Sequence, residues 1–254
     1  MATATAALQR VRGSSLIDAI GLLLLSGVVL WLLFKLFEDP TRFLNVAIIG
    51  ATNGAIYGLV ALGYTLVYGI LQLINFAHGD VFALSGLVAS TLIVEVFELD
   101  AETGVLLVVL GLLATLAVTV PLFAVLNATI ERIAYKPLRR APRLAPLITA
   151  VGMSFIIQNI SLALYGVDFE SVPNFIPRTD AITIGGVAIQ WNKIGVFLIV
   201  VPVLLVLIWF VRSTRQGKGM RAVAQDPEAS AMMGIDVNRT ISVTFFLAGS
   251  LAAV

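Results

Sequence analysis

The stretch that decides the fold is GVLLVVLGLLATLAVTVPLFAVLN, residues 104–127. It contains no Asp, Glu, Lys or Arg, and its apolar residues form one long block without the alternation of a half-buried strand. About 20 predominantly apolar residues are enough for a helix to cross the ~30 Å hydrocarbon core of a bilayer. The stretch therefore predicts a membrane-spanning helix.

Blocks of the same kind recur on both sides of this stretch. The 254 residues are 59% hydrophobic and 12% charged, whereas soluble domains are about 45–50% apolar and about 25% charged. The sequence predicts an all-α, polytopic membrane helix bundle with about six complete transmembrane helices and a truncated seventh, in one domain (1–254) that is incomplete at its C-terminus. The predicted spans are 16–37, 44–71, 81–97, 104–127, 145–166 and 194–211, with a partial span at 241–254.

The first block follows Arg10 and Arg12, as the apolar core of a signal peptide would. It is longer than such a core, and it ends in Lys35, Glu38 and Asp39 without a small-x-small cleavage pattern. We therefore expect an uncleaved first span.

Charged residues alternate between the loops that these spans would join, and cytoplasmic loops carry an excess of Lys and Arg. One set of loops is basic and holds Arg10, Arg12, Arg132, Lys136, Arg139, Arg140, Arg143, Arg212, Arg215, Lys218, Arg221 and Arg239. The opposite set is acidic and holds Glu38, Asp39, Glu95, Glu98, Asp100, Glu102, Asp168, Glu170 and Asp180, with only Lys35, Arg42, Arg178 and Lys193 against them. The pattern predicts a cytoplasmic N-terminus. The turn at 72–80 is the exception, because it falls on the cytoplasmic side without any Lys or Arg, unless it dips into the bilayer.

The second span carries two stripes of unusual residues. The first stripe consists of Gly50, Gly54 and Gly58. Small residues spaced by four let another helix backbone approach closely, so ordinary helix packing is their expected role. The second stripe is polar and aromatic, and in lipid each member needs a partner or a water-filled cavity. Its members are candidates for the translocation path or its gate: Asn53, Tyr57, Tyr64 and Tyr68.

The turn after this span gathers the only histidine of the chain, His78, with Asn75 and Asp80. An ionisable group near membrane depth is a functional candidate by default. The alternative is a structural cap, in which Asn75 or Asp80 satisfies backbone amides at a helix break and Gly79 adopts an unusual dihedral angle. One histidine and one carboxylate make a poor metal site, and neither has a nucleophile beside it, so no metal and no catalytic residue are expected.

The fifth span presents further polar side chains along one face. These either hydrogen-bond to neighbouring helices or line a path for a polar solute. The face holds Ser154, Gln158, Ser161 and Tyr165, with Asn159 next to it, and the candidates for the translocation path are Ser154, Gln158 and Asn159.

The basic loop at 212–239 contains the pattern of a short helix. Asp226 suits the N-cap, Pro227 the first helical position, Glu228 the first turn, and Gly234 the position after the helix, with Ile235 closing it. Such a short helix is marginal alone. Ala229, Ala231, Met232 and Met233 offer adaptable apolar contacts for a groove in another protein, or for the lipid interface or the bundle itself.

Three motifs resemble the H-type permease subunit of branched-chain amino-acid ABC importers. They are Ala61 to Gly69 followed by Asn75-Phe76-Ala77-His78-Gly79-Asp80, Tyr135 to Arg140 leading into Leu147 to Gly152, and Gly219 to Ile235. The last is similar to the family's coupling loop, which seats in an ATPase subunit, and the residues it would place there are Arg221, Asp226, Pro227, Glu228, Ala229 and Gly234. The resemblance implies a second permease subunit (homo- or heterodimer), cytoplasmic ATP-binding subunits, an extracytoplasmic binding protein and a prokaryotic inner membrane.

The expected function is passage of branched-chain amino acids, driven by the separate ATPase. The chain lacks a G-x-x-x-x-G-K-[ST] loop, so it should hydrolyse nothing and hold no cofactor, and its net charge of +1 gives no field for nucleic acid. Urea and short-amide permeases are similar at the same positions. Other classes left open are a channel or secondary carrier, and an intramembrane enzyme using His78 and Asp80.

Overall fold

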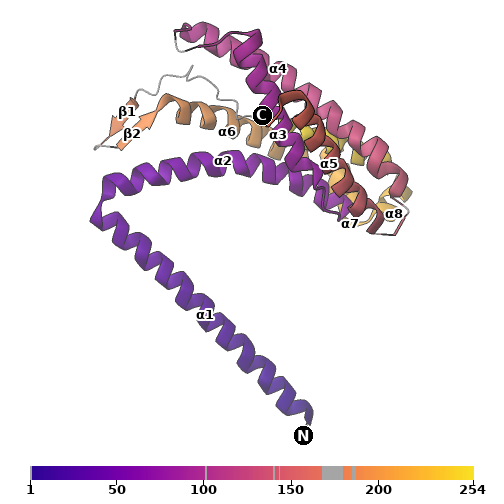
Figure 1. Ribbon diagram of the computed structural model, residues 1–254. Coiled ribbons are helices and arrows are strands. Elements are labelled where there is room, and N and C mark those ends of the chain that lie inside the picture. Colours follow the sequence, from indigo (N-terminus) through magenta and orange to yellow (C-terminus); the bar gives the residue numbers. More distant parts are fainter. Residues whose placement is uncertain (1, 101, 140, 143, 168–179, 185–186) are drawn as a thin grey trace. The chain divides into compact units, whose positions relative to one another are not determined.

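Helices make up most of the chain in the computed structural model, which describes residues 2–100, 102–139, 141–142, 144–167, 180–184 and 187–254 (Figure 1). Some charged residues used above to orient the loops lie outside this part of the chain: Arg140, Arg143, Asp168, Glu170 and Arg178. The chain divides into two compact units. One comprises Met1–Gly50 with Asp180–Ile189, and the other Ala51–Thr179 with Gln190–Val254.

The first unit is built from α1 (Ala2–Glu38), the start of α2 (Pro40–Leu71), and a two-stranded sheet of β1 (Asp180–Ile184) and β2 (Val187–Gln190). The Asp39 carboxylate accepts a hydrogen bond from the Arg42 amide at 2.9 Å. Together with Pro40 at the first helical position, it starts α2 as an N-cap does. The predicted all-α class is confirmed, and this short sheet, rich in β-branched residues, is a small addition to it.

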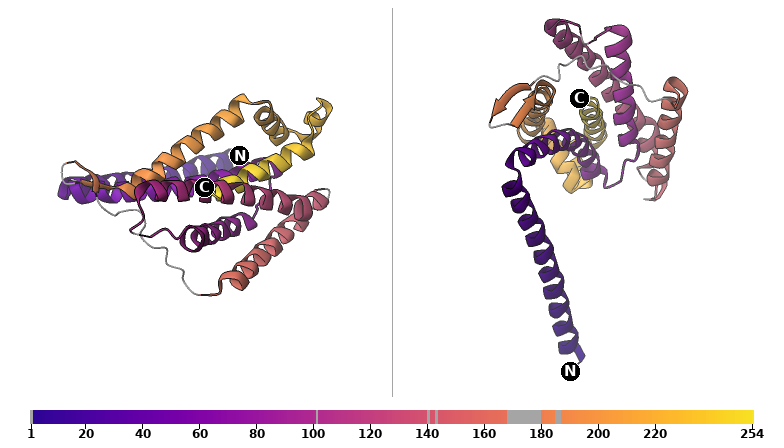
Figure 2. Two further views of the ribbon diagram at one scale, coloured as in Figure 1. Left: turned by 90° about the horizontal axis from the view of Figure 1, so that it is seen from above. Right: turned by 60° about the vertical axis from the view of Figure 1, so that its left-hand side comes forward.

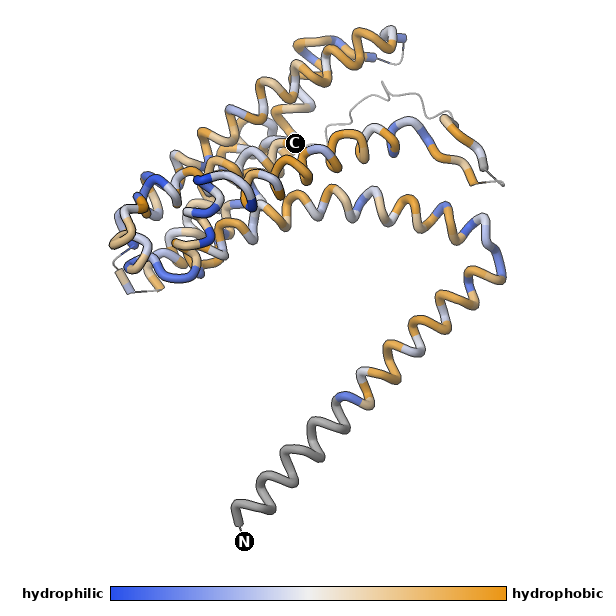
Figure 3. The backbone as a smooth tube through the Cα atoms, turned by 180° about the vertical axis from the view of Figure 1, so that it is seen from behind, coloured by the Kyte–Doolittle hydropathy of each residue, from blue (hydrophilic) through white to orange (hydrophobic). Residues whose placement is uncertain are grey.

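Among the described residues, six helices are long and apolar enough to cross a membrane, in agreement with the predicted number. They are Asp18–Glu38, Pro40–Leu71, Ala77–Val96, Val105–Leu138, Leu144–Tyr165 and Trp191–Ser213. Figure 3 shows hydrophobic residues along their lengths. The fourth extends beyond the predicted end at 127, because α4 (Val105–Ile130) continues into the π-helical η2 (Glu131–Tyr135) and the 3₁₀ turn η3 (Lys136–Leu138).

The centre of the second unit is α9 (Val237–Ala252), which includes most of the predicted partial span. It runs antiparallel to α4 and also packs on α3 (Ala77–Thr91), as the yellow helix in Figure 2 shows. At Gly249 the two backbones come so close that an added Cβ would lie 2.4 Å from the carbonyl oxygen of Phe123. Phe245 and Ala248 are fully buried. The last apolar segment is therefore the core helix of this unit.

The break between α2 and α3 lies inside the bundle. Gln72, with a φ of 54°, ends α2 in the left-handed conformation. Asp80 in the first turn of α3 hydrogen-bonds to Ser154, which lies half-way along the 22-residue α5 (Leu144–Tyr165). The third span thus begins at Ala77 rather than 81 and starts beside the middle of α5. Asn75, Ala77 and His78 are buried in this turn, at 2%, 0% and 1% exposure.

The remaining helices form an elbow at one end of the second unit. α6 (Trp191–Ser213) packs through Val200 and Leu207 against α2 and α9. α7 (Arg215–Gln225) follows, capped by the Thr214 hydroxyl, which accepts from the Gly217 amide at 3.0 Å. An added Cβ at Gly217 would lie 2.3 Å from the Phe210 carbonyl oxygen, so α7 turns back tightly on α6. The six-residue α8 (Pro227–Met232) leads on to α9.

Candidate functional site

A buried polar contact joins the helix break to η2 and α9. The Tyr135 hydroxyl donates to Asn75 Oδ1 at 2.7 Å, and the Tyr135 ring packs on Phe245 with centroids 5.4 Å apart. The cap that was one interpretation of this turn is wrong. α3 has no side-chain cap, since Asn75 and Asp80 use their side chains elsewhere, and Gly79 has an ordinary helical backbone.

Replacing Tyr135 with phenylalanine is expected to destabilise the second unit by about 1–3 kcal/mol, because Asn75 Oδ1 then lies buried without its donor. Unfolding of the purified protein by SDS in mixed micelles measures this. Tyr68→Phe is the matched control, since Tyr68 is 49% exposed and should change stability little. Equal effects of the two substitutions would contradict the importance of the buried bond.

His78 is 1% exposed and belongs to the contact between α2 and α3. Its Nε2 lies 3.2 Å from the Val60 carbonyl oxygen, and its ring lies 6.2 Å from that of Tyr64. Gly63 makes room for it, because a Cβ there would be 2.8 Å from His78 Nε2. His78 and Asp80 therefore face different neighbours and form no catalytic pair, and no group of three or more metal-ligating residues occurs among those described.

Three predicted candidates meet between α3 and α5. The Asp80 carboxylate accepts from the Ser154 hydroxyl and from Gln158 Nε2, the latter at 2.9 Å. Gln158 also donates to Ser154 at 3.1 Å. A cavity of about 340 Å³ opens beside this cluster. Asn159 does not join it, because its side chain bonds to the Phe155 carbonyl of its own helix.

The stripes of α2 do not converge on this cluster. Asn53, Tyr57 and Tyr68 are exposed on the described part of the chain. Within the second unit, a Cβ on Gly54 or Gly58 would meet no atom within 4 Å, so no described helix of that unit packs against these two glycines. The packing role of the glycine stripe stays a prediction. The close approach on α2 occurs instead at Gly63.

The structure confirms the predicted helix in the basic loop. Asp226 Oδ1 accepts from the amides of Glu228 and Ala229 at 2.9 and 3.0 Å. Gly234, with a φ of 80°, ends the helix, and the amides of Gly234 and Ile235 bond to the carbonyls of Ala231 and Ser230 in a Schellman pattern. Met232 and Met233 are 85% and 83% exposed. Arg221, also exposed, reaches the Arg212 carbonyl at 3.4 Å.

A buried ion pair that the sequence analysis missed lies where α4 meets the start of α9. Glu131 is fully buried and pairs with Arg139, and its other oxygen accepts from the Ser242 hydroxyl at 2.7 Å. Arg139 also donates to Asn238, four residues after Gly234. In the sequence, Arg139 is one of many basic loop residues. The only sign of a buried pair is Glu131, an acid close to the predicted end of an apolar block.

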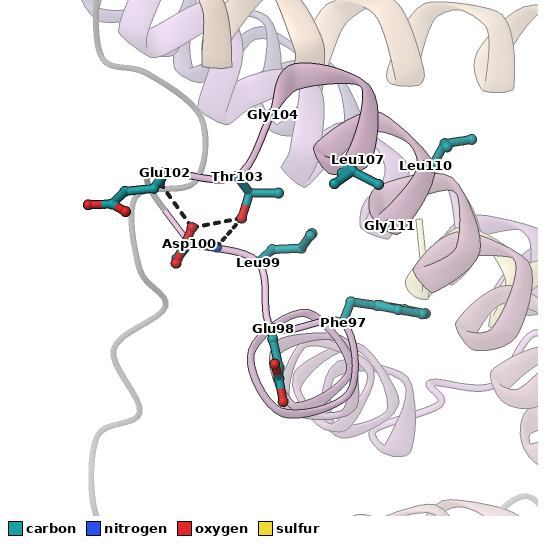
Figure 4. Close-up of a pocket in the computed structure, with 10 residues that line it drawn as sticks. All are labelled: Phe97, Glu98, Leu99, Asp100, Glu102, Thr103, Gly104, Leu107, Leu110 and Gly111. Atoms are coloured by element: carbon teal, nitrogen blue, oxygen red, sulfur yellow. Dashed lines mark hydrogen bonds between the residues drawn. The ribbon is translucent and has the colours of Figure 1, made fainter.

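A cavity of about 640 Å³ lies at the start of α4, at the opposite end of this helix from the ion pair. Figure 4 shows the residues that line it. It is lined from Phe97 to Gly111 and includes three of the acids predicted outside the membrane, Glu98, Asp100 and Glu102. The Thr103 hydroxyl donates to Asp100 at 2.7 Å and holds the pKa of that carboxyl below its usual range. The acidic loop and the basic loop thus lie at opposite ends, as the alternation of charge predicts.

Comparison with known proteins adds to this geometry. Residues 46–254 match the model of a family described as branched-chain amino acid transport system / permease component. The chain belongs to this family. The permease is 35% identical to the high-affinity branched-chain amino acid transport system permease protein BraD of Pseudomonas aeruginosa over 216 residues, which is 84% of this chain and 69% of BraD. It is 32% identical to LivH of Escherichia coli K12, covering 85% of this chain and 70% of LivH.

A more distant relative is the galactose/methyl galactoside import permease protein MglC of Escherichia coli, 27% identical over 84% of this chain and 62% of MglC. No solved structure matches the permease. The matched region contains Asp80, the Glu131–Arg139 pair and α8, whereas α1 precedes it. The chain is therefore a membrane-spanning transport subunit, and the channel, secondary-carrier and enzyme interpretations give way to this one.

Proposed function

We propose that this permease passes branched-chain amino acids across a prokaryotic inner membrane. The support is the similarity to BraD and LivH, whose names give that substrate class. In this proposal an external binding protein delivers the amino acid, separate ATP-binding subunits supply the energy, and a second permease subunit completes the path. The N-terminus and the loop with α8 lie in the cytoplasm.

The observation that carries the coupling role is the exposure of α8. A helix of six residues cannot hold itself in water, yet both of its ends are capped and two methionines point away from the chain. Methionine side chains adapt to the groove of a partner. The residues of this permease that would contact the ATP-binding subunit are Met232 and Met233 with Arg221, Asp226, Pro227, Glu228, Ala229 and Gly234.

A mechanical path leads from α8 into the bundle. Ser230, the one buried residue of α8, accepts from Ile235, and the next residues start α9 with Asp236 as its cap. Arg139 ties this start to η2 through Asn238 and Glu131. Movement of α8 by a closing ATPase would thereby reach α4, and through Tyr135 the turn at Asn75. Along this path we place His78, Tyr64 and Asp80 as gating or passage residues.

The exposed polar stripe of α2 then needs an occupant other than lipid, because polar groups at membrane depth need partners. We assign the face with Asn53, Tyr57 and Tyr68 to the water-filled path, and the seam with Gly50, Gly54 and Gly58 to contact with the second permease subunit.

Replacing Met232 and Met233 together with aspartate is expected to abolish binding of the ATP-binding subunit and to lower uptake at least about tenfold, since two charges would enter an apolar contact. Co-purification of the native complex, followed by uptake of labelled leucine, methyl galactoside and urea into proteoliposomes with the binding protein, measures both. The control pair Met232→Leu and Met233→Leu keeps the surface apolar and should bind. Co-purification of the aspartate variant at the unmodified level would refute the coupling role.

Uptake of the galactoside or urea by the unmodified permease, in place of leucine, would refute the proposed substrate.

A further inference from the structure

Asp80 is the only acidic residue in α2, α3, α4, α5, α6 and α9. It lies beside the middle of α5, and no Lys or Arg of the described residues forms an ion pair with it. An unpaired ionisable side chain at membrane depth is costly and marks a functional site. Its place in the first turn of α3 favours a negative charge there, because the helix dipole is positive at that end.

The two hydrogen bonds to Asp80 leave part of its capacity unused. A carboxylate accepts about four hydrogen bonds, and Ser154 and Gln158 supply one each. Both donors are neutral, so they orient the carboxylate without cancelling its charge. What is missing is a positively charged donor.

The cavity next to the charged Asp80 side chain is lined mainly by apolar residues. Its volume is about 340 Å³, and aliphatic side chains of Ala83, Leu87 and Leu162 line it. Tyr165 also lines it, and its hydroxyl oxygen accepts a hydrogen bond from the Thr91 hydroxyl at 3.4 Å. One carboxylate beside an aliphatic wall suits a ligand with a cationic head and a hydrocarbon body. A bare divalent cation needs six or more oxygen ligands, which this wall does not offer.

We propose that Asp80, oriented by Ser154 and Gln158, binds the α-ammonium group of an amino acid during passage, while Ala83, Leu87 and Leu162 contact its aliphatic side chain. The proposal rests on the proposed function and adds a site of recognition within the permease itself. It also gives a reason for selectivity, because urea and galactosides carry no ammonium group.

Labelling tests the charge and the ligand directly. The chain contains no cysteine, so Ala83→Cys places a single thiol of this subunit in the cavity. In the assembled importer, a cationic aminoethyl methanethiosulfonate should react about tenfold faster than the anionic sulfonatoethyl reagent, because unlike charges attract at close range. Leucine should slow the reaction, whereas urea should not. Adding Asp80→Asn should remove both the preference for the cation and the protection by leucine. Ser154→Ala leaves the carboxylate in place and should keep the preference for the cation.

Uptake separates this inference from the proposed function. Asp80→Asn keeps the size of the side chain and a carbonyl acceptor, yet leucine uptake should fall by about 10- to 100-fold, the range of a lost hydrogen bond to a charged group. Ser154→Ala removes one of the two orienting donors but keeps the carboxylate and the bond from Gln158, so it should lose clearly less uptake than Asp80→Asn. If the unmodified permease takes up leucine and Asp80→Asn takes it up equally well, the inference is overturned while the proposed function stands. Equal losses in Asp80→Asn and Ser154→Ala would also overturn the inference, because they would indicate that Asp80 only ties α3 to α5. If the Asp80→Asn variant does not assemble, the labelling of Ala83→Cys alone decides. The inference is overturned if that variant shows no preference for the cationic reagent, or no protection by leucine.

Discussion

Replacing Gly249 with alanine is expected to destabilise the bundle by about 3 kcal/mol or more, at the upper end of the cost of overpacking. The added methyl carbon would lie 2.4 Å from the Phe123 carbonyl oxygen, 2.6 Å from Asn127 Cβ and 3.1 Å from Ala124 Cα. Two of these atoms belong to the backbone, so no side-chain rotation relieves the clash and α9 must move away from α4. The same movement stretches the bond from Asn127 Nδ2 to the Phe245 carbonyl, now 2.6 Å.

The measurement is SDS-driven unfolding in mixed micelles, together with the yield of monodisperse protein. Gly86→Ala is the matched control, because a Cβ at Gly86 in α3 would meet no atom within 4 Å. It should be neutral or slightly stabilising, since alanine favours a helix over glycine by about 1 kcal/mol. A Gly249→Ala protein as stable as the control would show that α4 and α9 do not approach in this way.

Arg139→Ala is expected to cost about 3–5 kcal/mol, because it leaves the carboxylate of Glu131 buried without its charge partner. Glu131 would retain only the Ser242 hydroxyl, and Asn238 would lose its link to η2. The same unfolding assay gives the stability. Leucine uptake should fall further than stability alone explains, since the start of α9 would no longer be tied to α4.

The double variant Glu131→Met with Arg139→Met is the control for this prediction. It removes both charges and fills the space with apolar atoms, which is often neutral for a buried pair. Stability should therefore recover, while uptake should stay low if the pair transmits movement from α8. Recovery of uptake along with stability would assign the pair a structural role only.

Local features of this chain could be predicted from its sequence, and contacts between distant segments could not. Apolar blocks gave the number of spans, because lipid imposes length and composition on a helix regardless of its neighbours. Asp226, Pro227 and Gly234 gave the ends of α8, because caps act over three or four residues. The hydrogen bonds from Asp80 to Ser154 and Gln158 join residues 74 and 78 positions apart, so the sequence offered the candidates but not their meeting.

Two failures have the same physical origin. The cap interpretation of the turn at 72–80 assumed that Asn75 and Asp80 serve their own helix, whereas partners on η2 and α5 compete more strongly for both side chains. Glu131 was passed over because a buried acid is indistinguishable in sequence from a loop acid until its cation is located. Here that cation lies eight residues away, on the far side of a π-helical turn.

The packing of α4 on α9 has a consequence for how this protein is made. Asn127 finds its partner 118 residues later in the chain, and Thr119 finds Ala253 only after 134 residues. At a synthesis rate of about 5–20 residues per second, Asn127 is made roughly 6–24 seconds before Phe245, whereas the Thr119 hydroxyl can already donate to the Thr115 carbonyl of its own helix. During that interval the Asn127 amide lacks its α9 partner, and a polar group at membrane depth needs another one. The contact between α4 and α9 can therefore form only after α9 has been synthesised.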